Sequence, residues 1–180
     1  MSQLETQPAS DIEVFLSDGT RKHLSDFWKV KPLVLVFLRH FGSPFCREQV
    51  AQLCRGKDKF DREILQIVLV NMGTLTEAED FRRQFSVPFP IICDPEKLLY
   101  KGYGLKGGSM LQIFSPRVFL KGLRTIRQGH FPGLRQGDPF QLSGVILIDR
   151  QGRVVFRYYS RDPSDYATVE TILAAASHLS

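Results

Sequence analysis

Long apolar runs separated by polar stretches of helical length dominate the first half of this chain. The run from Leu33 to Leu38 has six apolar residues without a polar interruption, and a second run extends from Ile64 to Val70. Such runs are typical of strands that are covered on both faces, as in a parallel sheet. Thr76 and Glu79 have the spacing of a capping box that opens a helix through Phe85. This strand–helix–strand–helix order predicts an α/β fold with right-handed crossovers.

The segment after the first run carries a cysteine at a predicted helix start. Ser43 followed by Pro44 indicates an N-cap and a first helical residue, and Gly56 predicts the helix end. Cys46 then occupies the third helical position, near unpaired backbone N–H groups and the positive end of the helix dipole. This position favours a thiolate, so we expect a lowered pKa for Cys46. The alternative is that Cys46 is a small buried packing residue.

Shorter elements flank this unit on both sides. The first ten residues are polar and are expected to form a poorly ordered tail. The pattern further predicts a hairpin of residues 12–16 and 21–24, a proline-bounded strand over 87–95, a helix over 96–103, a second hairpin of 144–149 and 153–159, and a closing helix from 162 to 179.

Size and composition favour a single domain over residues 1–180. The chain has 180 residues, of which 43% are apolar and 24% charged, enough for one substantial core. Three cysteines form no disulfide framework and suggest a reducing compartment, so we expect a cytoplasmic location. The N-terminal residues do not have the pattern of a secretory signal, and no apolar run approaches the length of a membrane span.

The net charge of +5 comes from one stretch. Residues 106–137 contain six Lys and Arg residues and no Asp or Glu, whereas the rest of the chain has 18 basic and 19 acidic residues. Such a stretch is suited to nucleic acid, an anionic membrane surface, an acidic partner or an anionic substrate, or it is an ordinary solvated helix face. Pro116 and Gly122 interrupt the apolar stripe of this stretch, and a membrane-surface helix is not favoured because its polar face is too discontinuous.

The residues around Cys46 resemble the active-site region of a known family. Phe37, Arg39, Gly42, Cys46 and Arg47 match the pattern F-x-R-x-x-G-C-x-x-C-R, with Ser43 in place of the first cysteine. This pattern is similar to that of the peroxiredoxin-like branch of the AhpC/TSA family, within the thioredoxin-like superfamily. The segments PFPIICDPEKLLYKGYGL, P-R-V and G-H-F-P-G also resemble this branch. The resemblance implies a thioredoxin-like fold: a central mixed sheet flanked by helices, with an N-terminal β-hairpin and an inserted basic helical segment.

The resemblance also implies a thiol-dependent antioxidant oxidoreductase. Cys46 would attack a peroxide and become a sulfenic acid, with Ser43 capping the helix and contacting the sulfur, and Arg39 stabilising the thiolate. Further candidates for stabilising the thiolate or binding substrate are Arg117, Arg47 and His40. Disulfide exchange between positions 43 and 46 is impossible without the first cysteine. Ser43 to Cys46 also resembles the T-x-x-C or, less often, S-x-x-C of peroxiredoxins proper, but Arg39 stands where those proteins usually have a proline. Ser143 stands where thioredoxin-like proteins have a cis-proline.

The oxidised thiol would be recycled by an external thiol such as thioredoxin or glutathione. Cys54 and Cys93 are alternative resolving residues, although Cys54 lies about 12 Å along the helix from Cys46. His40 or His130 is an alternative base for Cys46. We expect no metal or cofactor, no nucleic-acid partner and no insertion into a membrane; a homodimer remains open.

Two other functions remain open from the sequence. The first is a catalytically degenerate thioredoxin-fold module that binds or regulates through the basic 106–137 stretch. The second, allowed by the resemblance, is reduction of a lipid-like endoperoxide.

Overall fold

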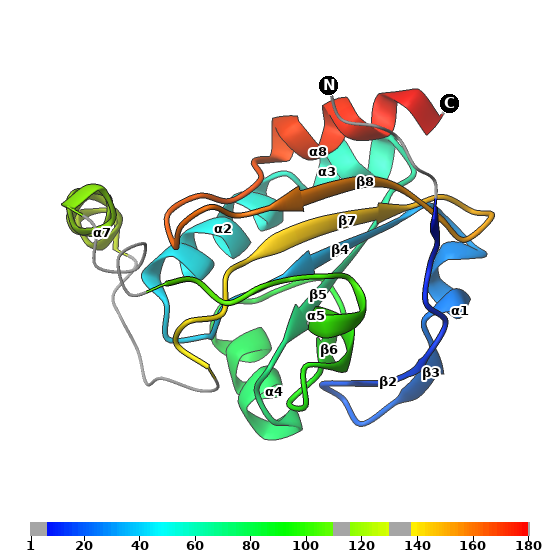
Figure 1. Ribbon diagram of the computed structural model, residues 1–180, viewed down its shortest axis with the longest axis horizontal. Coiled ribbons are helices and arrows are strands. Elements are labelled where there is room, and N and C mark those ends of the chain that lie inside the picture. Colours follow the sequence, from blue (N-terminus) through cyan, green and yellow to red (C-terminus); the bar gives the residue numbers. More distant parts are fainter. Residues whose placement is uncertain (1–6, 110–115, 130–137, 180) are drawn as a thin grey trace.

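The computed structural model describes residues 7–109, 116–129 and 138–179, except for the side chains of Arg117 and His178. Within these residues, eight strands form one sheet in the order β1-β8-β7-β4-β5-β6-β2-β3 (Figure 1). The strands are β1 (Gln7–Pro8), β2 (Glu13–Leu16), β3 (Arg21–His23), β4 (Leu33–Phe37), β5 (Gln66–Asn71), β6 (Ile91–Cys93), β7 (Gly144–Ile148) and β8 (Arg153–Tyr159).

The central strand β4 is paired differently on its two sides. It runs parallel to β5, where Val36 lies opposite Leu69, and antiparallel to β7, where Phe37 lies opposite Gly144. β5 and β6 are also parallel, whereas the remaining pairs in the sheet are antiparallel. The sheet is therefore mixed, and the thioredoxin-like α/β fold expected from the sequence is confirmed.

Helices cover both faces of the sheet. Successive residues of β4 point to opposite faces, so its side chains contribute to two separate cores. Val34 and Val36 face a core that includes side chains of α2 (Pro44–Arg55), α3 (Lys57–Arg62), α4 (Leu75–Gln84) and α8 (Val169–Ala176). Leu33, Leu35 and Phe37 face a second core with α1 (Ser25–Trp28) and α5 (Leu98–Gly102). A 3-10 turn, η1 (Ser177–Leu179), follows α8. The full burial of β4 on both faces agrees with its unbroken apolar run.

Several boundaries differ from the sequence prediction. The capping box of α4 is formed by Thr74 and Glu77, not by Thr76 and Glu79: the Thr74 N–H donates to Glu77 Oε2 at 2.8 Å, and the Glu77 N–H donates to Thr74 Oγ1 at 3.3 Å. Glu79 instead binds the side chain of Arg82 on the same helix.

Both ends of the chain also differ from expectation. The closing helix begins at Val169, seven residues later than predicted, because Thr168 is its N-cap and accepts the N–H of Thr171. Gln7 and Pro8, placed by the prediction in a poorly ordered tail, form β1 and pair with β8.

The basic segment contains an uninterrupted helix, α7 (Pro116–Arg127). Pro116 is its first residue, where a missing N–H costs nothing, and Gly122 lies within it. The helix itself is therefore not broken at these two residues. α7 lies at the edge of the molecule beside α2, and Figure 1 looks almost along its axis. Among the described residues, no helix is both long and apolar enough to cross a membrane.

Candidate active site

Cys46 lies at the start of α2, directly beyond the carboxyl end of the central strand. Ser43 is the N-cap with an extended backbone, Pro44 is the first helical residue, and Cys46 is the third, as predicted. The backbone N–H of Arg39, two residues past β4, donates to Cys46 Sγ at 3.1 Å. The strand and the helix thus bring a backbone donor and a thiol together.

The thiol is buried, with only 2% of the residue exposed. Burial raises the pKa of Cys46, because a thiolate loses its hydration in this core. The Arg39 guanidinium, the backbone N–H groups of Arg39 and His40, and the Ser43 hydroxyl act in the opposite direction and favour the thiolate. The expectation of a lowered pKa is therefore wrong for this conformation, because desolvation outweighs the helix start and its donors.

Ser43 does not use its side chain as predicted. Its backbone has the N-cap conformation, but the hydroxyl makes no capping hydrogen bond to α2. Instead, Ser43 Oγ accepts from Arg39 Nη1 at 3.4 Å and interacts with the Cys46 thiol. The hydroxyl thus lies between the guanidinium and the sulfur, and its predicted contact with Cys46 is present whereas its predicted cap is not.

The Arg39 side chain is buried and held by two carbonyls from a distant part of the chain. Its Nε donates to the Gln141 carbonyl at 2.9 Å, and Nη2 donates to the Pro139 carbonyl at 2.6 Å. The position of this guanidinium beside Cys46 therefore depends on the residues that lead into β7. Sequence reasoning missed both partners, since every residue has a carbonyl and the pairs are about a hundred positions apart.

Tyr100 is a second residue of the site that the sequence did not identify. Its fully buried hydroxyl is shared between the carbonyls of Leu38 at 2.5 Å and Val70 at 3.0 Å, at the ends of β4 and β5. Burial raises the pKa of Tyr100 well above its ordinary value, and a negative charge on Cys46 adds to this rise. The phenol therefore stays protonated and fixes the strand ends beneath the thiol.

The other predicted residues are spread around this centre. Arg47 Nε donates to the Phe41 carbonyl at 2.9 Å, and its guanidinium lies 5.2 Å from the centre of the Phe85 ring. His40 is buried, and its backbone N–H, next to that of Arg39, favours the thiolate of Cys46. Arg117 lies in α7 with a side chain outside the described part of the structure, and His130 lies wholly outside it.

The two other cysteines are reduced and lie on different elements. Cys54 is half-buried near the end of α2, and burial raises its pKa. Cys93 ends β6, donates to the Thr74 carbonyl at 3.8 Å, and has a pKa raised to about 11 by burial and by the charge of Glu77. Which thiol would resolve oxidised Cys46 therefore stays a prediction. Among the described residues, no group of His, Cys, Asp and Glu could hold a metal ion.

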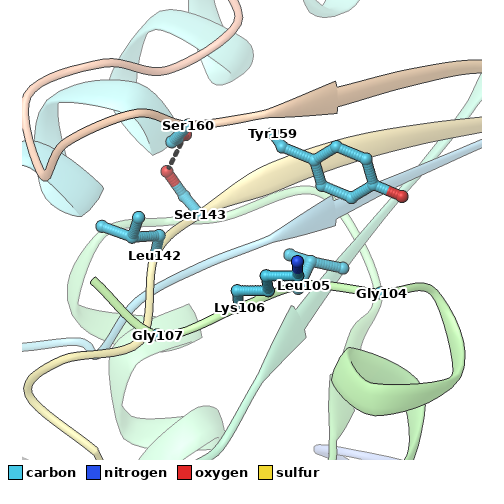
Figure 2. A pocket seen from close by; sticks show the side chains of 8 residues that line it. All are labelled: Gly104, Leu105, Lys106, Gly107, Leu142, Ser143, Tyr159 and Ser160. Atoms are coloured by element: carbon cyan, nitrogen blue, oxygen red, sulfur yellow. Dashed lines mark hydrogen bonds between the residues drawn. The ribbon is translucent and has the colours of Figure 1, made fainter. Parts of the chain in front are cut away.

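A cavity of about 400 Å³ lies next to Ser143 (Figure 2). Ser143 Oγ lies 2.7 Å from Ser160 Oγ, and no peptide bond in the described residues is cis. Leu142, Tyr159 and residues 104–107 complete the lining. The residues that line this cavity do not include Cys46.

Comparison with known proteins agrees with this architecture. The Thioredoxin-like protein AAED1, chloroplastic, of Arabidopsis thaliana is 30% identical over 173 residues, covering 91% of this chain and 69% of that protein. A prostamide/prostaglandin F synthase of Salmo salar is 28% identical, covering 97% of this chain and 89% of that protein. Peroxidoxin BcpB of Mycobacterium tuberculosis has the same fold, with a TM-score of 0.73, 16% identity and 97% of both chains covered.

The family model of the AhpC/TSA antioxidant enzymes matches residues 52–162. The matched range begins within α2, after Cys46, and ends beyond β8. It covers more than half of the chain and four of the eight strands, β5 to β8. The chain therefore belongs to the AhpC/TSA antioxidant enzyme family, and it is similar to that family's peroxiredoxin-like members.

Proposed function

We propose that the protein is a thiol peroxidase in which Cys46 is the reacting residue. The observation that carries this proposal is the set of donors around one sulfur: the Arg39 N–H at 3.1 Å, the Ser43 hydroxyl and the Arg39 guanidinium. A structural cysteine in an apolar core needs none of these groups. Membership of an antioxidant enzyme family supports the same chemistry.

The proposed reaction begins with loss of the Cys46 proton. The thiolate attacks one oxygen of a hydroperoxide, the O–O bond breaks, and the leaving oxygen takes up a proton and departs as an alcohol or water. Cys46 becomes a sulfenic acid. A thiol reductant then displaces water to form a mixed disulfide, and a second thiol releases Cys46 and leaves as the oxidised disulfide. Arg39 and Ser43 stabilise the anion before attack.

The burial of Cys46 should make the reaction rate depend on pH and on the size of the peroxide. With a raised pKa, little of the sulfur is ionised at neutral pH, so the peroxide rate should increase with pH into the alkaline range. Because Cys46 is only 2% exposed, we expect small peroxides to react faster than bulky ones. Peroxide must reach the thiol through a local opening at the start of α2.

The test is a stopped-flow peroxide assay of the wild-type protein, with Cys46→Ser and Cys54→Ser as paired variants. Trapping with dimedone and mass spectrometry then locates the sulfenic acid. We expect oxidation in the wild type and in Cys54→Ser, with a dimedone adduct at Cys46, and no adduct in Cys46→Ser. Oxidation no faster than that of free cysteine would reject the proposal and favour the degenerate binding module.

We propose an external thiol, such as thioredoxin or glutathione, as the reductant. Cys54 lies on the same helix and Cys93 lies on β6, which supports external over internal recycling. Steady-state turnover with each reductant should persist in Cys54→Ser and Cys93→Ser. Loss of turnover in either variant would identify that cysteine as the resolving residue instead. These thiols require a reducing compartment, for which we propose the cytoplasm, although one relative is named chloroplastic.

Endoperoxide reduction is a second candidate, and one observation favours it. Relatives that cover most of the chain are named prostamide/prostaglandin F synthases. In an endoperoxide, the Cys46 thiolate would attack one oxygen, break the O–O bond and form a sulfenate ester, while the other oxygen takes up a proton. A reductant thiol then attacks the sulfur, breaks the S–O bond and forms a mixed disulfide, so both oxygens stay on one molecule as hydroxyls. Comparing a lipid endoperoxide with a small hydroperoxide under equal thiol concentrations distinguishes the two candidates, because preference for the endoperoxide would reverse the expected order of size.

A further inference from the structure

The outer face of α7 is the most apolar exposed surface on the described helices. Phe119 is 68% exposed, Leu120 67% and Leu123 47%. At about 3.6 residues per turn, these three positions lie on one side of the helix. A helix of this kind normally buries its apolar side against the protein. α7 instead presents it to the surroundings.

The side of α7 that contacts the protein carries polar groups beside apolar ones: Gly122 faces the Phe45 ring, and Val118 and Ile126 are half-buried. Thr125 is buried, and its hydroxyl donates to Glu48 Oε2 at 3.0 Å on α2. Lys121 Nζ donates to the Ser164 carbonyl at 3.4 Å. Hydrogen bonds therefore help to attach α7 to the body, while its most exposed side chains are apolar. Figure 1 places α7 at the edge of the molecule, beside α2.

Positive charge borders this apolar face. Lys121, Arg124 and Arg127 are all exposed on α7, and residues 106–137 contain no Asp or Glu. Glu48 of α2 lines a pocket together with Lys121 and Arg124. An exposed apolar face beside a basic edge complements a bilayer surface, which offers anionic headgroups above an apolar layer.

We propose that α7 is a peripheral membrane-binding helix that lies on an anionic lipid surface. Phe119, Leu120 and Leu123 enter the boundary between headgroups and acyl chains, while Arg124 and Arg127 contact lipid phosphates. The helix has 12 residues, about 18 Å of rise, so it lies in the interface and does not span it. This inference does not depend on the chemistry of Cys46. It replaces the expectation that the basic segment does not form a membrane-surface helix.

A second copy of the chain fits this face less well. In a two-fold symmetric contact, the same surface meets itself, so Arg124 and Arg127 would approach their own counterparts. No acid within residues 106–137 could pair them. Three exposed apolar side chains are also few for a stable dimer, which typically buries about 800 Å² on each partner.

The test is co-sedimentation of the full chain with vesicles of phosphatidylcholine, alone or mixed with phosphatidylserine. We expect binding to the mixed vesicles that weakens in high salt, and little binding to phosphatidylcholine alone. The double variant Phe119→Ser/Leu120→Ser should bind about tenfold more weakly or worse. Each of Arg124→Gln and Arg127→Gln should weaken binding roughly fivefold.

The matched control is Val30→Ser/Leu98→Ser, which changes two apolar residues of similar exposure, 66% and 55%, on other elements. It should bind like the wild type. Because all these side chains are exposed, circular dichroism should show every variant folded. Equal sedimentation of wild type and Phe119→Ser/Leu120→Ser, or none by the wild type, overturns the proposal. A dimer in analytical ultracentrifugation that this variant abolishes, without vesicle binding, assigns the face to a second copy.

Discussion

The backbone N–H of Arg39 donates to the sulfur of Cys46, and the side chain of the same arginine favours the thiolate of that cysteine. Arg39 thus acts on Cys46 through two separate groups. Its guanidinium is in turn held by the carbonyls of Gln141 and Pro139. The electrostatics of the thiol are therefore linked to the chain that leads into β7, on the other side of the central strand.

Arg39→Met should make Cys46 less reactive. The variant keeps the backbone N–H but removes the charge that opposes desolvation, so the pKa of Cys46 should rise further. A rise of one pKa unit reduces the thiolate fraction about tenfold at neutral pH. The measurement is the rate of iodoacetamide labelling of Cys46 as a function of pH, read by mass spectrometry.

Arg62→Met is the matched control for this experiment, since Arg62 is exposed on α3. It should leave the labelling profile unchanged. Arg39→Met should also lower the free energy of unfolding by about 1–3 kcal/mol, because one buried and one partly buried carbonyl lose their donors. An unchanged labelling profile in Arg39→Met would show that the guanidinium does not act on the thiol.

Ser43→Ala and Thr74→Ala should affect different properties, because Thr74 stabilises a helix whereas Ser43 acts on the Cys46 thiol. The Thr74 hydroxyl accepts a hydrogen bond at the start of α4, so Thr74→Ala should cost about 1 kcal/mol of unfolding free energy. The Ser43 hydroxyl makes no such bond in α2, so Ser43→Ala should cost less. It should instead slow labelling of Cys46, because it removes a group that favours the thiolate. Denaturant titrations and labelling of both variants check this contrast, and a larger stability loss in Ser43→Ala contradicts it.

Local signals in the sequence were sufficient for the framework of the site. The apolar run of β4 and the Ser43–Pro44 pair correctly placed Cys46 at the third position of α2, because both depend on neighbouring residues only. The same local reasoning misplaced the capping box of α4. Thr74 and Thr76 are each followed by Glu three residues later, so spacing alone could not choose between them.

The electrostatic state of the site depends on tertiary structure and was not predictable in this way. A helix N-terminus favours the thiolate of Cys46, but the burial that reverses its effect comes from residues distributed over the whole fold. The carbonyls that hold Arg39 have no sequence signature. The orientation of α7 was hidden for the same reason, because an amphipathic pattern does not say which face contacts the protein.

Ionisation of Cys93 should lower the free energy of unfolding in alkaline solution. Its pKa is about 11 in the folded protein against 9.0 for an ordinary thiol, because burial and Glu77 disfavour the anion. The protonated form is thus favoured by folding: its contribution is complete below pH 9 and is lost as the pH rises toward 11. The full loss is about 2–3 kcal/mol.

Urea titrations of wild type and Cys93→Ala across this pH range measure the effect. At neutral pH, Cys93→Ala should be the less stable protein, because it loses a buried side chain. The difference between the two proteins should shrink as the pH rises. Parallel stability curves from pH 7 to 11 would mean that Cys93 has an ordinary pKa in the folded protein.

Gly144→Ala should disturb the fold next to the Arg39 anchor. Gly144 is the first residue of β7, and a Cβ there would lie 2.7 Å from the Tyr158 carbonyl oxygen and 3.0 Å from Leu105 Cδ2. The carbonyl belongs to the paired strand and cannot move without distorting the sheet, so we expect a loss of about 3 kcal/mol in unfolding free energy.

In Gly102→Ala, the new methyl group meets no atom within 4 Å, and alanine favours the helix α5. That control should be neutral or up to about 1 kcal/mol more stable. Equal effects in the two variants would show that the start of β7 adapts to a side chain.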